Sequence, residues 1–169
     1  MKRKIDLWQY APQICEQTGK GILLTTKAEG KVNTMTIGWG TLGIQWGKPI
    51  YTVFVRESRY TKELLDKNGE FTINVPVGEI DKSILGVCGT RSGRDMDKIA
   101  ELGLTLEESN CISVPGIKEL PLTLECKVIY RQDQDEKAIQ PDDIARYYPQ
   151  GDFHTAYYGQ VLDAYIIED

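Results

Sequence analysis

The sequence predicts a mainly β protein, a closed or split antiparallel β-barrel with flanking helices inserted between its strands. Roughly six segments have the alternating or β-branched pattern typical of strands, and short amphipathic segments separate several of them. This order favours a barrel over a doubly wound parallel sheet. The chain has 169 residues, 41% hydrophobic and 27% charged, which suits one domain with a buried core.

The first third of the chain predicts one helix followed by three strands. Leu7, Tyr10 and Ile14 recur at helical spacing, so we expect a helix over Asp6–Gln17 that is closed by Gly19. The expected strands are Ile22–Thr26, Val32–Trp39 after a Glu29-Gly30 turn, and Ile50–Val55, whose composition suits burial on both faces.

The middle of the chain predicts helices around one strand. Ser58 is a plausible N-cap for a helix that stops at Asn68-Gly69, and Phe71–Val75 alternates as a strand does. Two short helices are expected over Glu79–Val87 and Met96–Leu102.

The last third predicts two strands. Leu122–Tyr130 alternates apolar and polar residues, so we expect one face of this strand to meet solvent. Arg131–Lys137 is rich in charge and is expected to be a solvated loop. His154–Ile167 reads as a long strand interrupted at Gly159.

Charge and hydropathy exclude several classes of protein. Twenty basic against 25 acidic residues give a net charge of −5, which argues against a general nucleic-acid binder. No apolar run approaches the ~20 residues that span a bilayer, and the basic start lacks the apolar stretch of a signal peptide. We therefore expect a cytoplasmic protein that binds neither nucleic acid nor membrane.

Cysteine and histidine usage disfavours metal and hydrolytic chemistry. The cysteines show no C-x-x-C spacing, and we expect reduced, mostly buried thiols at Cys15, Cys88, Cys111 and Cys126. His154 is the only histidine, so a His-rich metal site is excluded and a catalytic triad would depend on that one residue. We expect no metal site and no hydrolase.

One motif match is rejected because the sequence around it does not suit the structure that the motif requires. Gly38–Gly43 satisfies the G-x-G-x-x-G pattern of dinucleotide-binding proteins. That pattern must open a helix whose N-terminus holds the pyrophosphate, whereas here a segment that cannot continue as a helix leads to Pro49 and a strand.

The segment Arg56–Thr61 joins a buried strand to a helix and predicts an anion site. Unpaired N–H groups at a helix start favour an anion, and Ser58 and Thr61 add hydroxyl donors. Arg56 and Arg59 add charge suited to phosphate. The competing interpretation is an ordinary N-cap with two surface arginines.

Two further segments are candidates for ligand binding. Cys88–Lys98 combines small residues, hydroxyls and bases before a helix, although a flexible connecting loop explains it as well. Asn33–Trp39 is too polar and too small for a plain core strand, and Gly38 and Gly40 let a flat group approach the backbone. Trp39 is either an apolar wall for that group or a core aromatic.

Taken in order, these motifs resemble the flavin reductase-like family, and more closely its flavoredoxin branch. The motifs are N-T-M-T-I-G-W, R-x-S-R-Y-T entering a helix, F-T-I-N-V-P, G-T-x-S-G-R-D-x-D-K and H-T-A-Y-Y-G-Q-V. The resemblance extends from about residue 20 to the C-terminus. It implies a Greek-key, FMN-binding split barrel spanning residues 1–169 as one domain, and a homodimer with FMN near the subunit interface.

The resemblance also implies which residues meet the cofactor. His154 falls where the family places a residue close to the flavin and is the catalytic candidate; a strand-start histidine bonded to a backbone carbonyl is the alternative. The cofactor-binding candidates are Asn33, Thr34, Met35, Thr36, Trp39 and Thr41 near the flavin ring; Arg56, Ser58, Arg59, Tyr60 and Thr61 near the phosphate; and Cys88, Gly89, Ser92, Gly93 and Lys98 closing over the cofactor.

The function implied is a flavin reductase-type oxidoreductase that moves hydride from NAD(P)H to FMN and electrons on to oxygen, a monooxygenase partner or another redox protein. Hydride transfer to a flavin needs few protein acids or bases, consistent with one histidine. The alternatives are an FMN-binding electron carrier reduced by a protein partner, and a binding module for another phosphorylated ring such as a pyridoxal phosphate relative.

Overall fold

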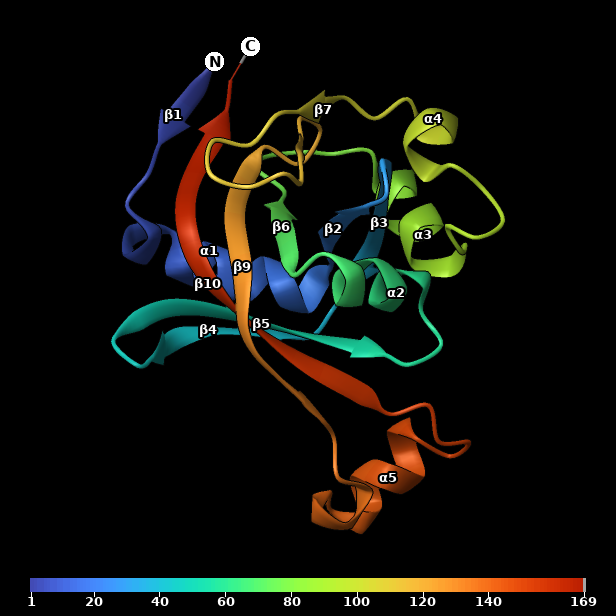
Figure 1. Ribbon diagram of the computed structural model, residues 1–169. Coiled ribbons are helices and arrows are strands. Elements are labelled where there is room, and N and C mark those ends of the chain that lie inside the picture. The colour runs from blue at the N-terminus through green and yellow to red at the C-terminus, as the bar shows by residue number, and fades with distance from the viewer. Residues whose placement is uncertain (169) are drawn as a thin grey trace.

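The computed structural model describes residues 1–168 and centres on one curved antiparallel sheet (Figure 1). Seven strands follow the order β3-β2-β6-β9-β10-β5-β4, and β1 also pairs with β10. The strands are β1 (Lys2–Lys4), β2 (Ile22–Ala28), β3 (Lys31–Ile37), β4 (Gly40–Gln45), β5 (Lys48–Arg56), β6 (Glu70–Val75), β9 (Leu122–Asp133) and β10 (His154–Ile167). A separate ribbon pairs β7 (Leu106–Glu107) with β8 (Gly116–Ile117).

The helices flank this sheet, as expected for the predicted fold class. They are α1 (Leu7–Lys20), α2 (Tyr60–Lys67), α3 (Lys82–Thr90), α4 (Lys98–Leu102) and α5 (Pro141–Tyr147). Strands β3 and β4 stand at the two ends of the strand order and are joined through Gly38 and Trp39 without pairing to each other. The described sheet is therefore a split barrel.

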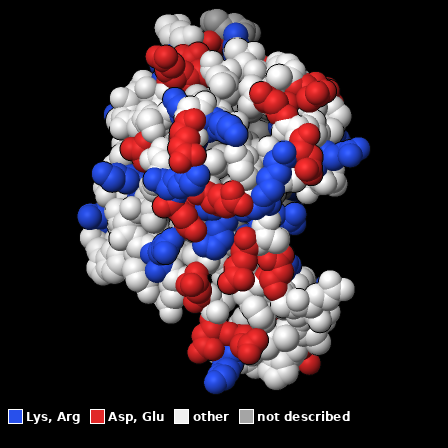
Figure 2. Space-filling model, turned by 45° about the vertical axis from the view of Figure 1, so that its right-hand side comes forward, with Lys and Arg blue, Asp and Glu red and all other residues white. Residues whose placement is uncertain are grey.

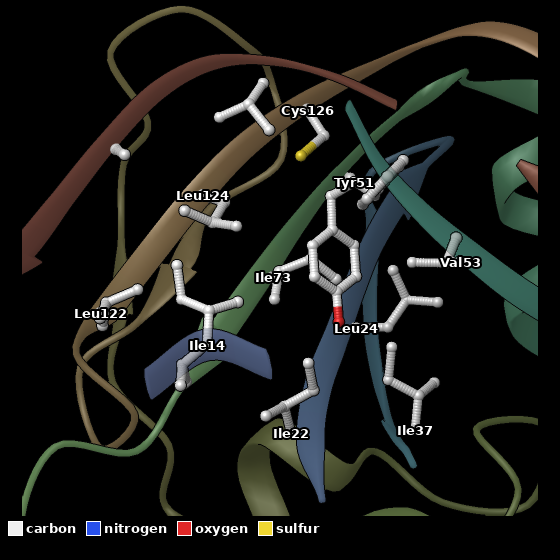
Figure 3. Packing of buried hydrophobic residues seen from close by; sticks show 14 of the residues in the cluster. Ile14, Ile22, Leu24, Ile37, Tyr51, Val53, Ile73, Leu122, Leu124 and Cys126 are labelled. Atoms are coloured by element: carbon white, nitrogen blue, oxygen red, sulfur yellow. The ribbon is translucent and has the colours of Figure 1, made fainter. Parts of the chain in front are cut away.

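The main core fills the inside of the curved sheet and is completed by α1 (Figure 3). Ile14 of α1 is fully buried against residues such as Leu24 and Ile73. The Tyr51 hydroxyl lies 2.7 Å from the Thr18 hydroxyl, so the one polar atom of this large core ring is paired. A second cluster, which includes Leu23 and Ile84, joins α3 to the outer side of β2.

Strands β9 and β10 extend past the barrel, and α5 lies beyond their ends (Figure 1). We call residues 134–153, which connect these two strands, the arm. The register of the pair shifts between Tyr158 and Gly159. A Cβ at Gly159 would lie 2.6 Å from Cε1 of Phe71, so glycine is required where the long strand crosses this core ring.

Several sequence predictions needed correction. Arg59, not Ser58, is the N-cap of α2, and it makes no side-chain capping bond. The first five residues of β9, from Leu122, are all buried, so neither face of this part of the strand is exposed to solvent. The segment predicted as a solvated loop after Tyr130 continues β9 to Asp133. The Gly-rich turn also starts later than expected, because α3 runs to Thr90.

The sequence analysis did not predict β1, β4, the β7–β8 ribbon or α5. Strand β4 occupies most of the rejected G-x-G-x-x-G segment, so no helix follows those glycines. All four cysteines are free, but Cys15 and Cys111 are exposed, which corrects the expectation of mostly buried thiols. No helix in residues 1–168 is both long and apolar enough to cross a membrane.

Candidate functional site

The candidate site is a groove made of two adjoining cavities beside β3. The first, the aromatic cavity, has a volume of about 180 Å³ and is lined by residues that include Trp39, Phe54 and His154. The second, the polar cavity, has a volume of about 340 Å³ and extends along α2, the end of α3 and the loop after it. Met35, Thr36 and Arg59 line both cavities, so the groove is continuous.

The polar cavity begins at the N-terminus of α2. Arg59 is exposed there and makes no ion pair within residues 1–168. Thr61, in the first turn, is buried and accepts a hydrogen bond from Asn33 Nδ2 at 3.0 Å. The positive end of the helix, the guanidinium and the hydroxyl together favour an anion.

Lys98 adds a buried cation to this cavity. Its residue is 3% exposed, and its Nζ donates to the carbonyl oxygens of Thr34 at 2.9 Å and Cys88 at 3.0 Å. Burial lowers the pKa of Lys98. No carboxylate within residues 1–168 pairs with it, and two acceptors leave one of its three N–H groups for a ligand.

Glycine lets the loop after α3 approach the β3 floor of the cavity. A Cβ at Gly93 would lie 2.7 Å from Cδ1 of Tyr60 and still closer to Oδ1 of Asn33. At Gly89 a Cβ would lie 3.3 Å from Cβ of Thr36. The loop therefore seats against Asn33 of β3 because Gly93 lacks a side chain, and Gly89 lets the last turn of α3 pack closely on Thr36 of β3.

Arg56 and Ser58 are both in the groove lining, but the arm occupies their polar atoms. The Arg56 guanidinium donates to the carbonyl oxygens of Asp152 at 2.9 Å and Tyr147 at 3.0 Å. Ser58 donates to the Asp152 carboxylate from its backbone N–H at 2.9 Å and from its hydroxyl at 2.6 Å. Burial alone would raise the pKa of Asp152, but the Ser58 hydrogen bonds and Arg56 outweigh it and lower that pKa.

His154 lies at the start of β10, directly opposite Arg56 on β5. Its side chain is buried, and its Nδ1 lies 2.7 Å from the Tyr148 hydroxyl. Burial, followed by the charge of Arg56, lowers the pKa of His154 to about 4. The imidazole is therefore neutral at pH 7, which allows one ring nitrogen to donate and the other to accept.

Trp39 forms the outer wall of the aromatic cavity. Its ring centroid lies 5.1 Å from those of both Tyr147 and His154, and the residue is 43% exposed. It is therefore not a core aromatic.

Figure 2 shows the arm projecting from the body of the molecule, with acidic and basic side chains interspersed over this face.

The structure brings most of the sequence-predicted site residues together. Thr34 and Thr41 do not line these two cavities: the Thr34 hydroxyl donates to the Leu24 carbonyl oxygen, and Thr41 lines a third cavity, which shares Gly38, Trp39 and Phe54 with the aromatic cavity. The predicted residues that line it are Asn33, Met35, Thr36, Trp39, Arg56, Ser58, Arg59, Tyr60, Thr61, Cys88, Gly89, Ser92, Gly93, Lys98 and His154.

As cofactor-binding candidates, sequence reasoning missed groove residues inside its predicted segments, namely Ile37, Gly38, Thr90, Arg91, Arg94 and Asp95, and others outside them. Phe54 lines the aromatic cavity from β5, two positions before Arg56, and strand alternation was the signal that places both on one face. Tyr148 and Asp152 contact groove residues from the arm, and no local pattern in the sequence points to those long-range contacts.

The split barrel is a fold known from solved structures. The chain is similar to the flavoredoxin of Desulfovibrio vulgaris, with 25% identity, a TM-score of 0.68 and coverage of 88% of this chain and 69% of that one. It is similar to the flavoredoxin of Methanosarcina acetivorans, with 28% identity, a TM-score of 0.67 and coverage of 88% and 68%. A flavin reductase-type structure with a split barrel domain, from Shewanella frigidimarina, matches the fold at 19% identity, a TM-score of 0.68 and coverage of 98% and 76%.

The chain belongs to the flavin reductase-like family: the model of the flavin reductase like domain matches residues 18–169. An uncharacterized protein of Archaeoglobus fulgidus is 33% identical over 132 residues, which cover 78% of this chain and 64% of that protein. The chain spans less than two thirds of the length of the curated relatives that it matches.

Proposed function

We propose that this protein binds FMN in the groove and acts as an oxidoreductase of the flavin reductase type, with NAD(P)H as reductant. The observation that carries the proposal is the pairing of two environments in one groove. The polar cavity holds Arg59 and Lys98, neither of which has a carboxylate partner within residues 1–168, and the aromatic cavity is walled by Trp39 and Phe54. A phosphate on a flat heteroaromatic ring needs both.

The residues present fit such a cofactor. Arg59, Lys98 and Thr61 offer charge and a hydroxyl for a phosphate, and the loop at Ser92 and Gly93 closes that end. Arg56 and Ser58, which the sequence places at the phosphate, have the arm as their partner instead. We therefore assign these two side chains to holding the arm.

We assign the flavin ring to the aromatic cavity, which a smaller set of side chains lines. Met35 and Thr36 on β3, Trp39 after it and His154 on β10 line the aromatic cavity. FMN, when bound, supplies the two-electron redox chemistry. The protein would then orient the flavin ring, exclude water from it with Trp39 and Phe54, and present hydrogen-bond donors to the ring.

A second candidate function is that of an FMN-binding electron carrier that a protein partner reduces. It is favoured by the similarity to two flavoredoxins at 25% and 28% identity. The two functions share the groove and differ in whether a nicotinamide reaches it. Electrons would pass on to oxygen, a monooxygenase or another redox protein in either case.

We also propose that the chain forms a homodimer and that residues 1–169 act as one flavin-binding domain. Ile44 and Trp46, at the turn of the β4–β5 hairpin, are 71% and 62% exposed. The Trp46 ring contacts Tyr130, which contacts Tyr158 in turn, so an apolar patch extends across β9 and β10. Contiguous exposed aromatics of this kind mark association surfaces.

The test is an anaerobic visible spectrum of the protein with FMN, before and after NADH or NADPH is added. A perturbed flavin spectrum that bleaches on the timescale of turnover supports the reductase. A perturbed spectrum that dithionite bleaches and both nucleotides leave unchanged supports the carrier. An FMN spectrum that the protein does not perturb removes both functions.

Arg59→Ala tests where the phosphate binds. The substitution should weaken FMN binding by about tenfold or more and change riboflavin binding far less, because riboflavin lacks the phosphate. Lys20→Ala is the control, since Lys20 is an exposed cation of α1 that pairs with Glu16 away from the groove. Equal losses for the two flavins would contradict the proposed phosphate site.

A further inference from the structure

We infer that Tyr148 is a positioning residue that fixes the ring orientation and the tautomer of His154, so that Nε2–H is presented to the aromatic cavity. The inference deepens the proposed function and rests on it only for the identity of the ligand. It concerns a residue of the arm that the sequence motifs do not include.

The first step is the geometry around the imidazole. The His154 backbone N–H donates to Oε1 of Gln134 at 3.0 Å, and its carbonyl oxygen accepts from the Gln134 N–H at 3.0 Å. The residue is thus anchored to the arm through its backbone. Its Nδ1 is engaged by Tyr148 at 2.7 Å, so Nε2 is the ring nitrogen left for the cavity that His154 lines.

The second step is the direction of the Tyr148–His154 hydrogen bond. Tyr148, Arg56, Asp152 and Arg59 are the titratable or charged groups that act on this ring. Burial and the two guanidinium groups hold the imidazole neutral at pH 7, so only one of its nitrogens carries hydrogen. A phenol donates better than it accepts, and an unprotonated imidazole nitrogen is a good acceptor. Tyr148 therefore donates to Nδ1, and the hydrogen of the ring lies on Nε2.

The third step is what holds Tyr148 in place. The residue follows α5 directly, is 6% exposed and stacks on Phe153 with ring centroids 4.9 Å apart. The Arg56 guanidinium lies 5.0 Å from the Tyr148 ring centroid and donates to the carbonyl oxygens of Tyr147 and Asp152. The cation against the ring face also strengthens the phenolic O–H as a donor.

A fixed Nε2–H has a defined use in this cavity. A donor that is already oriented stabilises negative charge on an acceptor atom without reorganising when that charge develops. Because the imidazole stays neutral well below pH 7, the donor is unchanged across the neutral range. The ligand chemistry that it suits is a carbonyl oxygen or ring nitrogen of an electron-accepting heterocycle.

The test uses the fact that His154 is the only histidine in the chain. A long-range ¹H–¹⁵N spectrum of the flavin-free protein at pH 7 contains one imidazole, whose two nitrogen shifts report the tautomer directly. We expect a protonated Nε2 and an unprotonated Nδ1. A protonated Nδ1, or an equal mixture of tautomers, overturns the inference whether or not the protein binds a flavin.

Two variants test the role of the hydroxyl. Tyr148→Phe should give averaged nitrogen shifts and slow FMN reduction at saturating NAD(P)H by about three- to tenfold, the effect of losing one hydrogen bond, with little change in KM. Tyr147→Phe is the matched control, since that neighbouring ring contacts Trp39 and the inference assigns its hydroxyl no role. A tautomer that Tyr148→Phe leaves unchanged, or a changed tautomer with an unchanged rate, contradicts the positioning role. Absence of any FMN binding by the wild type contradicts the proposed function and leaves the tautomer result standing.

Discussion

The hydroxyl of Tyr157 donates to the carboxylate of Asp66 at 2.6 Å and ties β10 to α2. The same carboxylate also pairs with Lys62 at 2.9 Å and Arg131 at 2.7 Å. Burial, followed by Asp66, raises the pKa of Tyr157 to about 12. Because α2 carries Arg59 and Thr61 into the polar cavity, this network fixes one wall of the groove relative to the barrel.

Asp66→Ala should lower the free energy of unfolding by about 1–3 kcal/mol, because it leaves the buried phenol of Tyr157 and two cations without their shared acceptor. Urea denaturation of the wild type and the variant measures the change. Glu63→Ala, on the same helix, is the control: its pair with Arg94 is about half exposed on both sides and should be worth less than about 1 kcal/mol. Equal losses of unfolding free energy in the two variants would show that the Asp66 network stabilises the protein no more than an exposed ion pair does.

Gly93→Ala should destabilise the protein by about 1–3 kcal/mol and weaken FMN binding, because the new methyl group meets Asn33 and Tyr60 and lifts the loop from β3. Gly86→Ala is the comparison. Gly86 is exposed in α3 with open space around it, so alanine should stabilise by up to about 1 kcal/mol. Thermal denaturation measures the change in stability, and a flavin titration measures the change in affinity. A Gly93→Ala protein with unchanged stability and affinity would refute the close seating of the loop against β3.

Stability should fall as the pH decreases from 6.5 to about 4. The folded-state pKa of His154 lies below its ordinary value of 6.5, so in this window the unfolded chain takes up a proton that the folded chain does not. The stabilising contribution is complete above pH 6.5. His154→Gln should remove it, so the Tm difference between wild type and variant should shrink across this window. Parallel Tm curves would contradict the buried, neutral imidazole. Asp66 and Asp152, whose pKa values are lowered below 3.8, act at more acidic pH.

Trp46→Arg should shift the protein from dimer to monomer in sedimentation velocity, because it places a charge in the exposed aromatic patch with Tyr130. Trp8→Arg replaces another exposed tryptophan, 48% exposed at the start of α1 and outside that patch. We expect it to leave the oligomeric state unchanged. A Trp46→Arg protein that stays dimeric would place the interface elsewhere.

The elements predicted correctly from sequence have patterns that extend over many residues. Ile50–Val55 is β-branched and aromatic throughout, and β5 is buried along most of its length as expected. The predicted interruption at Gly159 was wrong as a break in the strand: β10 is continuous there, and its pairing with β9 shifts register between Tyr158 and Gly159. Strand β1 has three residues and depends on pairing with β10, so no local pattern marks it. Helix α5 did have a signal, Pro141 followed by two acidic residues, which is typical of a helix start.

The candidate site was predictable where its residues are contiguous. The segments around Asn33, Arg59 and Gly93 each line the groove. Partners within the groove were not predictable, because Asp152 reaches Ser58 across 94 positions of the chain. A sequence pattern shows that Ser58 is a donor but not which acceptor the fold brings to it.

Under the proposed function, the Asp152 carboxylate also bears on the charge of the anion that the groove would accommodate. Around the polar cavity, the charge of Asp152 offsets that of Arg56, and Glu63 pairs with Arg94. Arg59, Arg91 and Lys98 then remain in the lining with Asp95, a net of two positive charges, which would balance the nearly two negative charges of a phosphate monoester at neutral pH. A monovalent carboxylate or an uncharged nucleoside would leave one or both of them uncompensated. Under the proposed function, a chain with a net charge of −5 would thus favour a divalent anion at this one place.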